Sequence, residues 1–330
     1  MKSDLIDVLQ QIQGKNILVI GDMVADVYLQ GIISRISREA PVLVLEQAAE
    51  KVIAGGAANV VHNVATLGGK AIAVGLIGKD SAGQGLVSIL SEKGVDTTGL
   101  FATEQRPTIT KTRIIAGGAA TVSQQIVRLD KETKEPLTAE IEAELMNYLA
   151  TVLTQVDGVV LSDYGSGTLT ESIVKQIYYH CKQNNIPTIV DSRYRVLFFK
   201  GADYIKQNDA EVAAIFGRPL DNEDALLEAG AFMLKELDAK GVLITRGAKG
   251  MTLFESNGAV HEIPVSNRSE VYDVSGAGDT CVATVILSLA AGIEPALAAE
   301  LSNFASGIAV RKLGTATVTK EELENVIGEN

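Results

Sequence analysis

The sequence predicts an α/β fold with three layers, in which helices cover both faces of a mostly parallel sheet and a small β lid is inserted. Short apolar runs rich in Val and Ile, such as 16–20 and 241–245, alternate with amphipathic stretches, a pattern typical of β-α units. This alternation breaks at about 27–46 and 106–130, where the residues favour strands outside the main sheet. Because the 330 residues contain no internal repeat or linker, we expect a single domain over 1–330, with these two segments forming the lid.

The individual elements follow from apolar periodicity and from the residues that end each run. Polar or glycine residues stop the apolar runs, which predicts main-sheet strands at 16–20, 70–77, 158–161, 187–190, 203–205 and 241–245. Capping residues bound the periodic stretches, which predicts helices at 57–67, 80–92, 138–155, 170–183, 221–238, 281–291 and 295–311, with a further one opening at 208. Two more strands are expected near 251–254 and 258–263. In the lid, 108–116 and 121–130 are strand-like runs joined across Gly117–Gly118, which indicates a hairpin.

Composition argues against several classes of partner. A formal net charge of -12, without long Lys/Arg blocks, disfavours nucleic acid and anionic membranes, because both need a basic surface. The longest apolar stretch, 281–293, is shorter than the ~20 residues of a membrane-spanning helix. The first residues do not have the layout of a signal peptide, so we expect a cytoplasmic protein. Cys181 and Cys281 lie far apart without a CxxC motif, so we interpret both as buried thiols.

The turn Gly276-Ala277-Gly278-Asp279, followed by an apolar helix, is the centre of the predicted site. Small residues that open a helix leave free backbone N–H groups pointing at one spot, and the helix dipole adds positive potential there. Such a place binds phosphate. A carboxylate beside an anion site is repelled unless it has its own role, and accepting a proton from an attacking hydroxyl is such a role for Asp279. The alternative is that Asp279 only favours the first turn of the helix.

A second glycine turn, Gly55-Gly56, precedes the helix at 57–67 and allows the backbone to approach a ligand closely. Asn59 lies in the first turn of that helix, where its amide reaches the same ligand. Asp26, shortly after the strand at 16–20, also faces the expected ligand edge of the sheet. The structural alternatives are a tight turn with an N-terminal amide, and a solvated or capping aspartate.

Basic residues gather in the expected lid, in a protein that is otherwise acidic. These residues would meet a phosphate on the substrate, although solvated charges on edge strands are the alternative: Arg106, Lys111, Arg113 and Arg128.

Other polar residues follow strands of the expected main sheet. Ser162–Gly165 and Asp191–Arg193 fall on the edge where ligands bind in α/β sheets. Asn208 and Glu211 form a capping-box pattern, with metal and phosphate positioning as the alternative role. Thr245–Gly250 is similar to a phosphate-contacting turn, and Gly250 also suits an ordinary hairpin.

The two glycine motifs, 55–59 and 273–280, resemble the two signatures of the ribokinase-like (PfkB) carbohydrate kinases, at the expected separation. Within that family, further stretches resemble the heptose 7-phosphate kinases of ADP-heptose biosynthesis, and the resemblance covers essentially the whole chain: 20–22, 34–42, 107–113, 128–130, 161–165 and 313–318. It implies a ribokinase-like fold and transfer of phosphate from ATP, with Mg²⁺, to the anomeric hydroxyl of heptose 7-phosphate. The product would be heptose 1,7-bisphosphate.

The resemblance also implies roles for individual residues. Asp279 would be the catalytic base, and the amides of Gly276, Ala277 and Gly278 would form the anion hole. The expected nucleotide contacts are Asn208, Thr245, Arg246, Gly247, Gly250 and Asn303. Asn208 and Glu211 would organise Mg²⁺ largely through water, and Asp273 and Ser275 would hold a monovalent cation such as K⁺. The expected substrate contacts are Asp26, Gly55, Gly56, Asn59, Lys111, Arg128, Asp163 and Arg193.

The chain departs from the usual heptose kinase pattern near the sugar and phosphate ends. Val27, Tyr28 and Leu29 stand where an Arg and an aromatic residue are usual, Ser166 replaces a common Lys, and Ser192–Arg193 replace Pro-Lys. A kinase for ribose, fructose or a fructose phosphate therefore stays open, as does a non-catalytic regulator that binds sugar phosphates. A dinucleotide oxidoreductase would need GxGxxG after the first strand and a P-loop kinase GxxxxGK[ST], and neither motif is found.

Two expectations concern the assembly. No adenylyltransferase half follows residue 318, so we expect a stand-alone kinase. An exposed β layer favours a homodimer formed through the lid.

Overall fold

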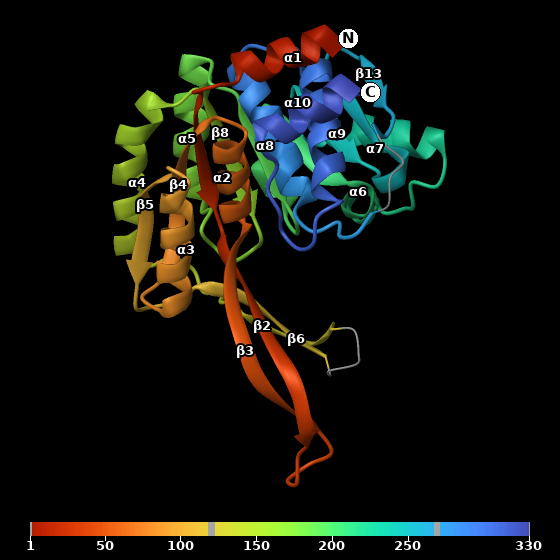
Figure 1. The fold of residues 1–330 in the computed structure, drawn as a ribbon. Helices are drawn as coiled ribbons and strands as arrows, with labels where there is room; N and C mark the ends of the chain where they lie inside the picture. Colours follow the sequence, from red (N-terminus) through yellow and green to blue (C-terminus); the bar gives the residue numbers. More distant parts are fainter. Residues whose placement is uncertain (1, 118–122, 267–270, 330) are drawn as a thin grey trace.

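The main sheet of the computed structural model, which describes residues 2–117, 123–266 and 271–329, has nine strands (Figure 1). These are β1 (Asn16–Gly21), β4 (Lys70–Gly78), β5 (Asp96–Thr103), β8 (Gly158–Asp163), β9 (Thr188–Ser192), β10 (Tyr204–Asn208), β11 (Gly241–Thr245), β12 (Met251–Glu255) and β13 (Val260–Ile263). Their spatial order is β13-β12-β11-β10-β9-β8-β1-β4-β5. All neighbours from β5 to β11 pair in parallel, and only β12 and β13 join antiparallel.

Helices cover both faces of this sheet and bury one apolar cluster on each. One cluster includes side chains of α1 (Lys2–Gln11), α2 (Ala57–Thr66), α3 (Ser81–Glu92), α8 (Ala277–Ala290), α9 (Pro295–Ala309) and α10 (Lys320–Glu329). The other includes side chains of α4 (Ala139–Val152), α5 (Glu171–Asn184), α6 (Asp209–Phe216) and α7 (Glu223–Leu237). Three short 3₁₀ turns are described in addition, η1 (Leu153–Gln155), η2 (Val196–Phe199) and η3 (Gly247–Lys249). The predicted three-layer fold with a mostly parallel sheet is confirmed.

Side-chain caps explain where several helices begin. The side chains of Asp80, Thr138 and Thr170 accept backbone N–H groups of the first turns of α3, α4 and α5. The predicted starts at 80, 138 and 170 are therefore the capping residues, one position before each helix. At the other ends of α5 and α7, Asn185 and Asp238 adopt left-handed backbone conformations with φ of 54° and 52°.

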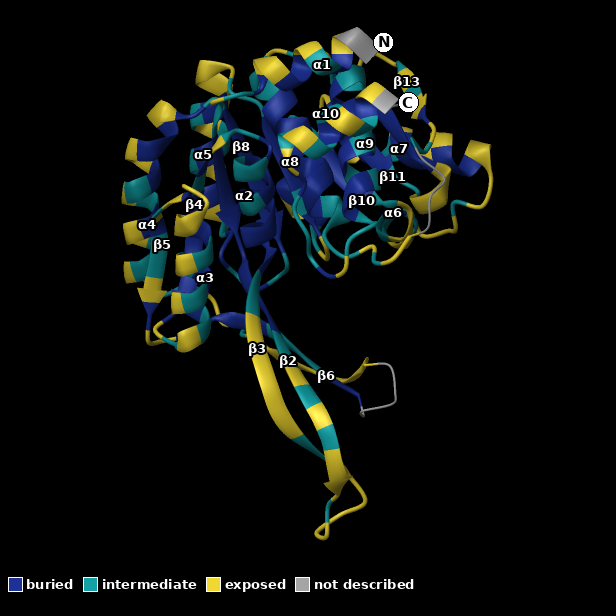
Figure 2. Ribbon diagram, viewed as in Figure 1, coloured by how far each residue is buried: buried dark blue, intermediate teal, exposed yellow. Residues whose placement is uncertain are grey.

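A second sheet of four strands lies below the main body in Figure 1. It has the order β3-β2-β6-β7, with β2 (Met23–Ile36), β3 (Leu43–Gly56), β6 (Ile109–Gly117) and β7 (Gln124–Lys131). β2 pairs in parallel with β6, whereas the β2–β3 and β6–β7 pairs are antiparallel. The long β2–β3 ribbon extends away from the body, and its outer part is largely exposed (Figure 2). Of the predicted turn at Gly117–Gly118, Gly118 lies outside the described residues.

The sequence predicts the first lid segment at 27–46, but its strands are longer and run from Met23 to Gly56. Met23, Val24 and Ala25 are buried, so β2 begins inside the body and continues outward without a break. β5 and α10 are among the elements that the sequence-based prediction does not include. β5 is a largely polar edge strand, whereas α10 is rich in charged residues, buries Leu323 and Ile327 in the core and packs Val326 against it. Among the described residues, no helix is long and apolar enough to cross a membrane.

Candidate active site

The parallel strands end at one edge of the main sheet, and the N-terminus of α8 lies at that edge. Lys206 of β10 extends to Gly278 in the first turn of α8, because a Cβ added to Gly278 would lie only 2.5 Å from the Lys206 Nζ. Asn59 of α2 reaches the same turn from the other side. The two glycine motifs that are far apart in the sequence therefore meet beside the ends of β8, β9 and β10.

Asp279 is the carboxylate at this meeting point. Its Oδ2 accepts a 2.7 Å hydrogen bond from the Asn59 side chain, and its Oδ1 accepts one of 3.3 Å from the Tyr164 hydroxyl. Burial raises the pKa of Asp279 to about 7, and the Asp191 carboxylate adds to this effect, whereas the Asn59 and Tyr164 hydrogen bonds and the Lys206 charge oppose it. A carboxyl group with a pKa near neutrality suits a general base.

The backbone of the turn requires glycine. Gly276 caps α8 with a φ of 81°, and a Cβ there would lie 2.8 Å from the Asn59 Nδ2. The amides of Ala277 and Gly278 belong to the first turn of α8, where helix geometry supplies no acceptor. Of these, the Ala277 N–H donates a long bond of 3.3 Å to the Val274 carbonyl. The turn has the form of an anion site, and the Asp279 carboxylate belongs to the same first turn of α8.

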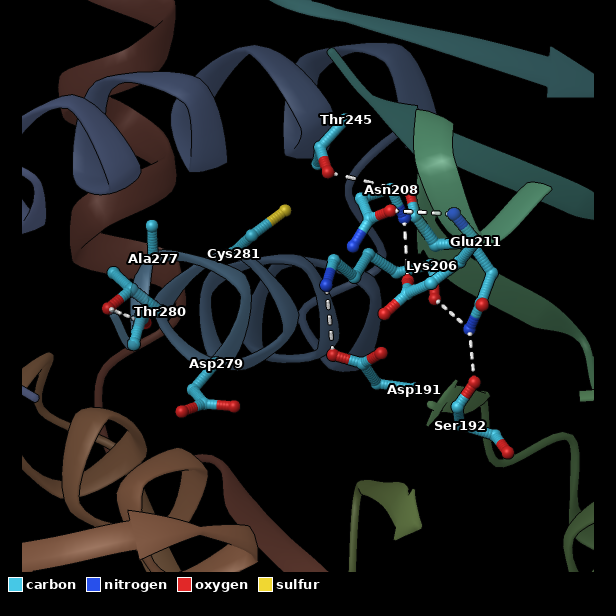
Figure 3. A network of polar contacts seen from close by, with 12 residues as sticks. Asp191, Ser192, Lys206, Asn208, Glu211, Thr245, Ala277, Asp279, Thr280 and Cys281 are labelled. Carbon is cyan, nitrogen blue, oxygen red and sulfur yellow. Dashed lines mark hydrogen bonds and ion pairs between the residues drawn. The ribbon is translucent and has the colours of Figure 1, made fainter. Parts of the chain in front are cut away.

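A buried charge network lies beside the first turns of α8 (Figure 3). The Lys206 Nζ contacts the Asp191 Oδ2 at 3.0 Å, and the Lys206 side chain is 7% exposed. Burial lowers the pKa of Lys206, but the Asp191 carboxylate outweighs this effect, so the pKa is raised well above the usual range. Lys206 is thus a fixed positive charge next to the anion site. The sequence-based prediction does not include it, and the signal that could have found it is a lysine within the otherwise uncharged run YIKQN.

Asn208 and Glu211 form the capping box that the sequence predicts at the start of α6. The Asn208 Oδ1 accepts the Glu211 N–H at 2.8 Å, and the Glu211 Oε2 accepts the Asn208 N–H at 2.9 Å. Burial raises the pKa of Glu211. Each side chain retains acceptor capacity toward water, which fits a water-mediated contact with a metal rather than direct ligation.

The other expected nucleotide contacts flank this box. The Thr245 Oγ1 donates to the Gln207 carbonyl at 3.4 Å, and the Arg246 Nη1 donates to the Thr252 Oγ1 at 3.2 Å. Gly247 and Gly250 both have positive φ and close the β11–β12 hairpin, so the hairpin interpretation of this turn holds. The Asn303 Nδ2 donates to the Pro264 carbonyl at 2.7 Å, which places Asn303 against the loop after β13.

Asp26 lies on β2 beside the two glycines of β3. The Arg113 Nη1 contacts the Asp26 Oδ1 at 2.6 Å, and the Thr315 Oγ1 donates to the Asp26 Oδ2 at 3.3 Å. A Cβ added to Gly55 would lie 2.6 Å from the Asp26 Oδ2, so glycine is required there. Gly56, with a φ of 53°, then turns the chain into α2.

Three of the four basic residues of the expected lid, Arg106, Arg113 and Arg128, are bound to other groups of the protein. Arg106 is buried and donates to the backbone carbonyls of Ser166 and Glu135, so it fixes loops, and Arg113 is bound to Asp26. Arg128 is half-exposed and pairs with Asp130 at 2.8 Å.

Lys111 and Arg193 are two cations near Tyr164, the residue whose hydroxyl contacts Asp279. The Lys111 Nζ lies 4.9 Å from the centre of the Tyr164 ring, and Arg193 lies over Tyr194. Burial lowers the pKa of Lys111, the Asp26 carboxylate opposes this effect, and the nearby positive charge of Arg193 adds to it. A bound anion would relieve this repulsion.

Asp163 lies at the end of β8 but is fully buried. Its Oδ2 accepts a 2.7 Å bond from the Ser192 hydroxyl, and its Oδ1 lies 2.6 Å from the Arg195 Nη2. This arrangement holds the turns after β8 and β9 together. A substrate contact of Asp163 would require one of these bonds to break.

Asp273 joins two loops near α8. Its Oδ1 accepts the Ser275 N–H at 2.9 Å, and its Oδ2 accepts the Gly314 N–H at 3.0 Å. Across the residues that the structure describes, no group of three or more His, Cys, Asp or Glu side chains is arranged to hold a metal ion.

The helix-flanked parallel sheet, the glycine turn that opens α8 and the buried carboxylate at its start define an enzyme of the ribokinase-like kinase class. The chain belongs to the pfkB family of carbohydrate kinases, whose model matches residues 15–322. The kinase family that the sequence resembles is therefore confirmed.

Curated relatives are considerably more similar in sequence than solved structures. The bifunctional protein HldE of Trichlorobacter lovleyi is 41% identical over 312 residues, covering 93% of this chain and 61% of the relative. That of Azorhizobium caulinodans is 40% identical over 317 residues, covering 96% of this chain and 65% of the relative. The chain thus spans less than two thirds of the length of these relatives.

Two solved structures share the fold. Arabidopsis thaliana ribokinase complexed with ribose and ATP has a TM-score of 0.73 at 19% identity, covering 96% of this chain and 99% of that one. Escherichia coli phosphofructokinase-2 with substrates and products has a TM-score of 0.74 at 20% identity, with the same coverage of 96% and 99%.

Proposed function

We propose that this protein transfers the γ-phosphoryl group of ATP to a hydroxyl of a sugar phosphate. The best candidate is heptose 7-phosphate, with heptose 1,7-bisphosphate as product. The observation that carries the proposal is the position of Asp279, a buried carboxyl with a pKa of about 7 at the N-terminus of α8. The resemblance to heptose 7-phosphate kinases and the similarity to the HldE proteins support this choice of substrate.

In the proposed reaction, Asp279 accepts the proton of the sugar hydroxyl while the hydroxyl oxygen forms a bond to the γ-phosphorus. The bond between that phosphorus and the bridging oxygen of ADP breaks, and ADP leaves with the electron pair. The amides of Gly276, Ala277 and Gly278, together with the helix dipole, stabilise charge on the transferring group. Lys206 adds a fixed positive charge at Gly278.

One pair of cations supports a sugar that already carries a phosphate. Lys111 and Arg193 form a cationic pair near Tyr164, in a protein with a net charge of -12. A phosphate on the sugar would bind both cations, whereas a neutral sugar would use neither charge. Lys111→Met and Arg193→Met should each raise KM for the sugar phosphate about tenfold, with KM for ATP unchanged. Lys79→Met, which removes an exposed partner of Glu104, is the matched control.

Mg²⁺ would enter with ATP and neutralise charge on its phosphates. Asn208 and Glu211 would hold it through water, which fits their capping-box geometry. Asp273 and Ser275 would hold K⁺ beside the anion site, and the test is the rate in K⁺ against that in tetramethylammonium.

We further propose that the four-stranded sheet acts as a lid over the sugar and forms a homodimer. Asp26 on β2 is paired with Lys111 on β6, and Lys111 contacts Tyr164, so this part of the sheet lies near Asp279. Closure of the sheet over the sugar would exclude water and limit ATP hydrolysis. The outer ribbon exposes apolar side chains that a second copy would cover: Ile32, Ile36, Val42 and Leu43.

One panel of acceptors tests the proposed function. ADP release is measured with heptose 7-phosphate, fructose 1-phosphate, fructose 6-phosphate, ribose and fructose, and Asp279→Asn serves as the control for background hydrolysis. We expect the highest kcat/KM with heptose 7-phosphate. Preference for ribose or fructose would reject a phosphorylated substrate, and absence of turnover with every sugar would indicate a non-catalytic regulator.

A further inference from the structure

Tyr164 follows β8 directly, and its backbone is fixed to a buried carboxylate. The Tyr164 N–H donates to the Asp22 Oδ2 at 2.8 Å, and the same oxygen accepts the Ser166 N–H at 3.0 Å. The Asp22 Oδ1 accepts the Thr168 N–H at 3.4 Å. Asp22 is 1% exposed, so the backbone of this turn is anchored to the interior of the protein.

The Tyr164 ring lies between the start of α2 and the four-stranded sheet. A Cβ added to Gly56 would lie 3.3 Å from the ring atom Cε2, which places that edge of the ring against the turn into α2. The Lys111 Nζ of β6 lies 4.9 Å from the ring centre, within the range of a cation–π interaction. The Tyr164 ring therefore contacts Lys111, a cation of the four-stranded sheet.

The hydroxyl at the far end of this ring reaches the proposed base. It donates to the Asp279 Oδ1 at 3.3 Å, while Asn59 donates to the Oδ2. Burial raises the pKa of Tyr164 well above its usual range, and the negative charge of Asp279 adds to this effect. The phenol therefore stays protonated and acts as a donor, so each oxygen of the base has one protein donor.

We propose that Tyr164 is a positioning residue for Asp279, which orients the carboxylate through its hydroxyl and couples it to the four-stranded sheet through the contact of its ring with Lys111. This inference rests on the proposed role of Asp279 as base. Tyr164 touches the base and not the reacting atoms, so its effect passes through the orientation and titration of Asp279. Movement of β6 would move Lys111, the ring and the hydroxyl together.

Removing only the hydroxyl isolates this role. The other groups that face Asp279 are Asp191 from β9, Lys206 from β10 and Asn59 from α2, and all of them remain in Tyr164→Phe. Because a donor to the charged form is lost, the pKa of Asp279 should rise by about 0.5–1 unit, the size of one neutral hydrogen bond.

The titration of Asp279 is measured in the free full-length protein, with carbon-13-labelled aspartate, by infrared difference spectra against Asp279→Asn. In Tyr164→Phe we expect the midpoint to move to higher pH, and the acidic limb of kcat/KM to move with it. Tyr178→Phe is the matched control, because the Tyr178 hydroxyl of α5 donates to the Phe199 carbonyl of η2 at 3.1 Å and does not contact Asp279. An unmoved midpoint in Tyr164→Phe, or an equal shift in Tyr178→Phe, would overturn the inference.

A double-mutant cycle tests the coupling to the sheet. Lys111→Met should shift the Asp279 midpoint in the wild-type background and leave it unchanged in Tyr164→Phe, which keeps the ring and lacks the hydroxyl. Equal shifts in both backgrounds would show that Lys111 acts on the base without Tyr164. The infrared titration needs no sugar, so its failure is distinguishable from failure of the proposed kinase function, which would appear as absent sugar turnover.

Discussion

Asn59 and Asp279 are 220 positions apart in the sequence and share a buried hydrogen bond of 2.7 Å. Each belongs to a different glycine motif, and each lies in the first turn of its helix, α2 or α8. The bond therefore joins the two motifs and holds the Asp279 carboxylate from the side of α2.

Loss of this bond should weaken catalysis in a pH-dependent way. In Asn59→Ala the pKa of Asp279 should rise, because its carboxylate loses a donor, so kcat/KM at about pH 7 should fall by ~10–100-fold and recover partly at higher pH. The measurement is the pH profile of kcat/KM. Asn184→Ala, which removes an exposed amide at the end of α5, is the control. A uniform loss at all pH values would instead indicate a packing role for Asn59.

The pKa of Asp279 also predicts how stability depends on pH. The pKa is raised from 3.8 to about 7, so the folded protein binds this proton more tightly than the unfolded chain does. Tighter binding of this proton contributes a few kcal/mol to the free energy of unfolding. The contribution is fully present below pH 3.8 and is lost as pH rises through about 7.

Asp279→Asn should therefore melt several °C higher than wild type at about pH 8, with the difference vanishing near pH 4. Thermal unfolding across this pH range measures it. If Asp279→Asn were less stable than wild type at every pH, the account that the buried Asp279 carboxylate destabilises the folded protein at high pH would be wrong.

Gly276 should be needed for both conformation and space. Gly276→Ala places a methyl group 2.8 Å from the Asn59 Nδ2 at a φ of 81°, so we expect a loss of ~1–2 kcal/mol in stability and of ~10² or more in kcat. Gly292→Ala is a matched control, since Gly292 has a φ of 78° and its added Cβ would have no neighbour within 4 Å. It should show the stability loss with normal kcat. Normal kcat in Gly276→Ala as well would exclude a role of this turn in catalysis.

Lys206 should stabilise charge on the transferred phosphoryl group and lower the pKa of Asp279. Lys206→Met leaves Asp191 buried without its partner and removes a charge that lowers the pKa of Asp279. We expect kcat to fall by ~10² and the acidic limb of its pH profile to move to higher pH. Lys240→Met, which breaks the more exposed ion pair with Asp203, should leave both unchanged. A Lys206→Met enzyme with a wild-type pH profile would contradict this role.

Local patterns predict the fold because the strands are buried and continuous. The runs before Gly21 and Thr245 are apolar to their ends, and the helices begin one residue after side chains such as Asp80 and Thr170 that accept hydrogen bonds from their first turns. β5 has no such apolar run, since most of its residues are polar, and it takes its place by pairing with β4. α10 follows a capping box, in which the Thr319 hydroxyl accepts the Glu322 N–H and the Glu322 Oε2 accepts the Thr319 N–H, but half of its ten residues are charged and its apolar pattern is short.

The site is predictable only in part, for a related reason. The backbone requirements at Gly276 and Gly55 leave a sequence signature, since a side chain would collide there. Pairings between side chains leave none. Nothing in the sequence indicates that Arg113 binds Asp26, that Arg195 occupies Asp163, or that Tyr164 and Lys206 converge on the N-terminus of α8.

The central claim is that Asp279 deprotonates a sugar hydroxyl. The most direct test compares Asp279→Asn with wild type for kcat with the accepted sugar phosphate and for the Kd of ATP in the same preparation. We predict that kcat falls by ~10² or more while the Kd of ATP changes little, because the amides of the turn and the nucleotide contacts remain. Turnover near the wild-type rate in Asp279→Asn would contradict the claim.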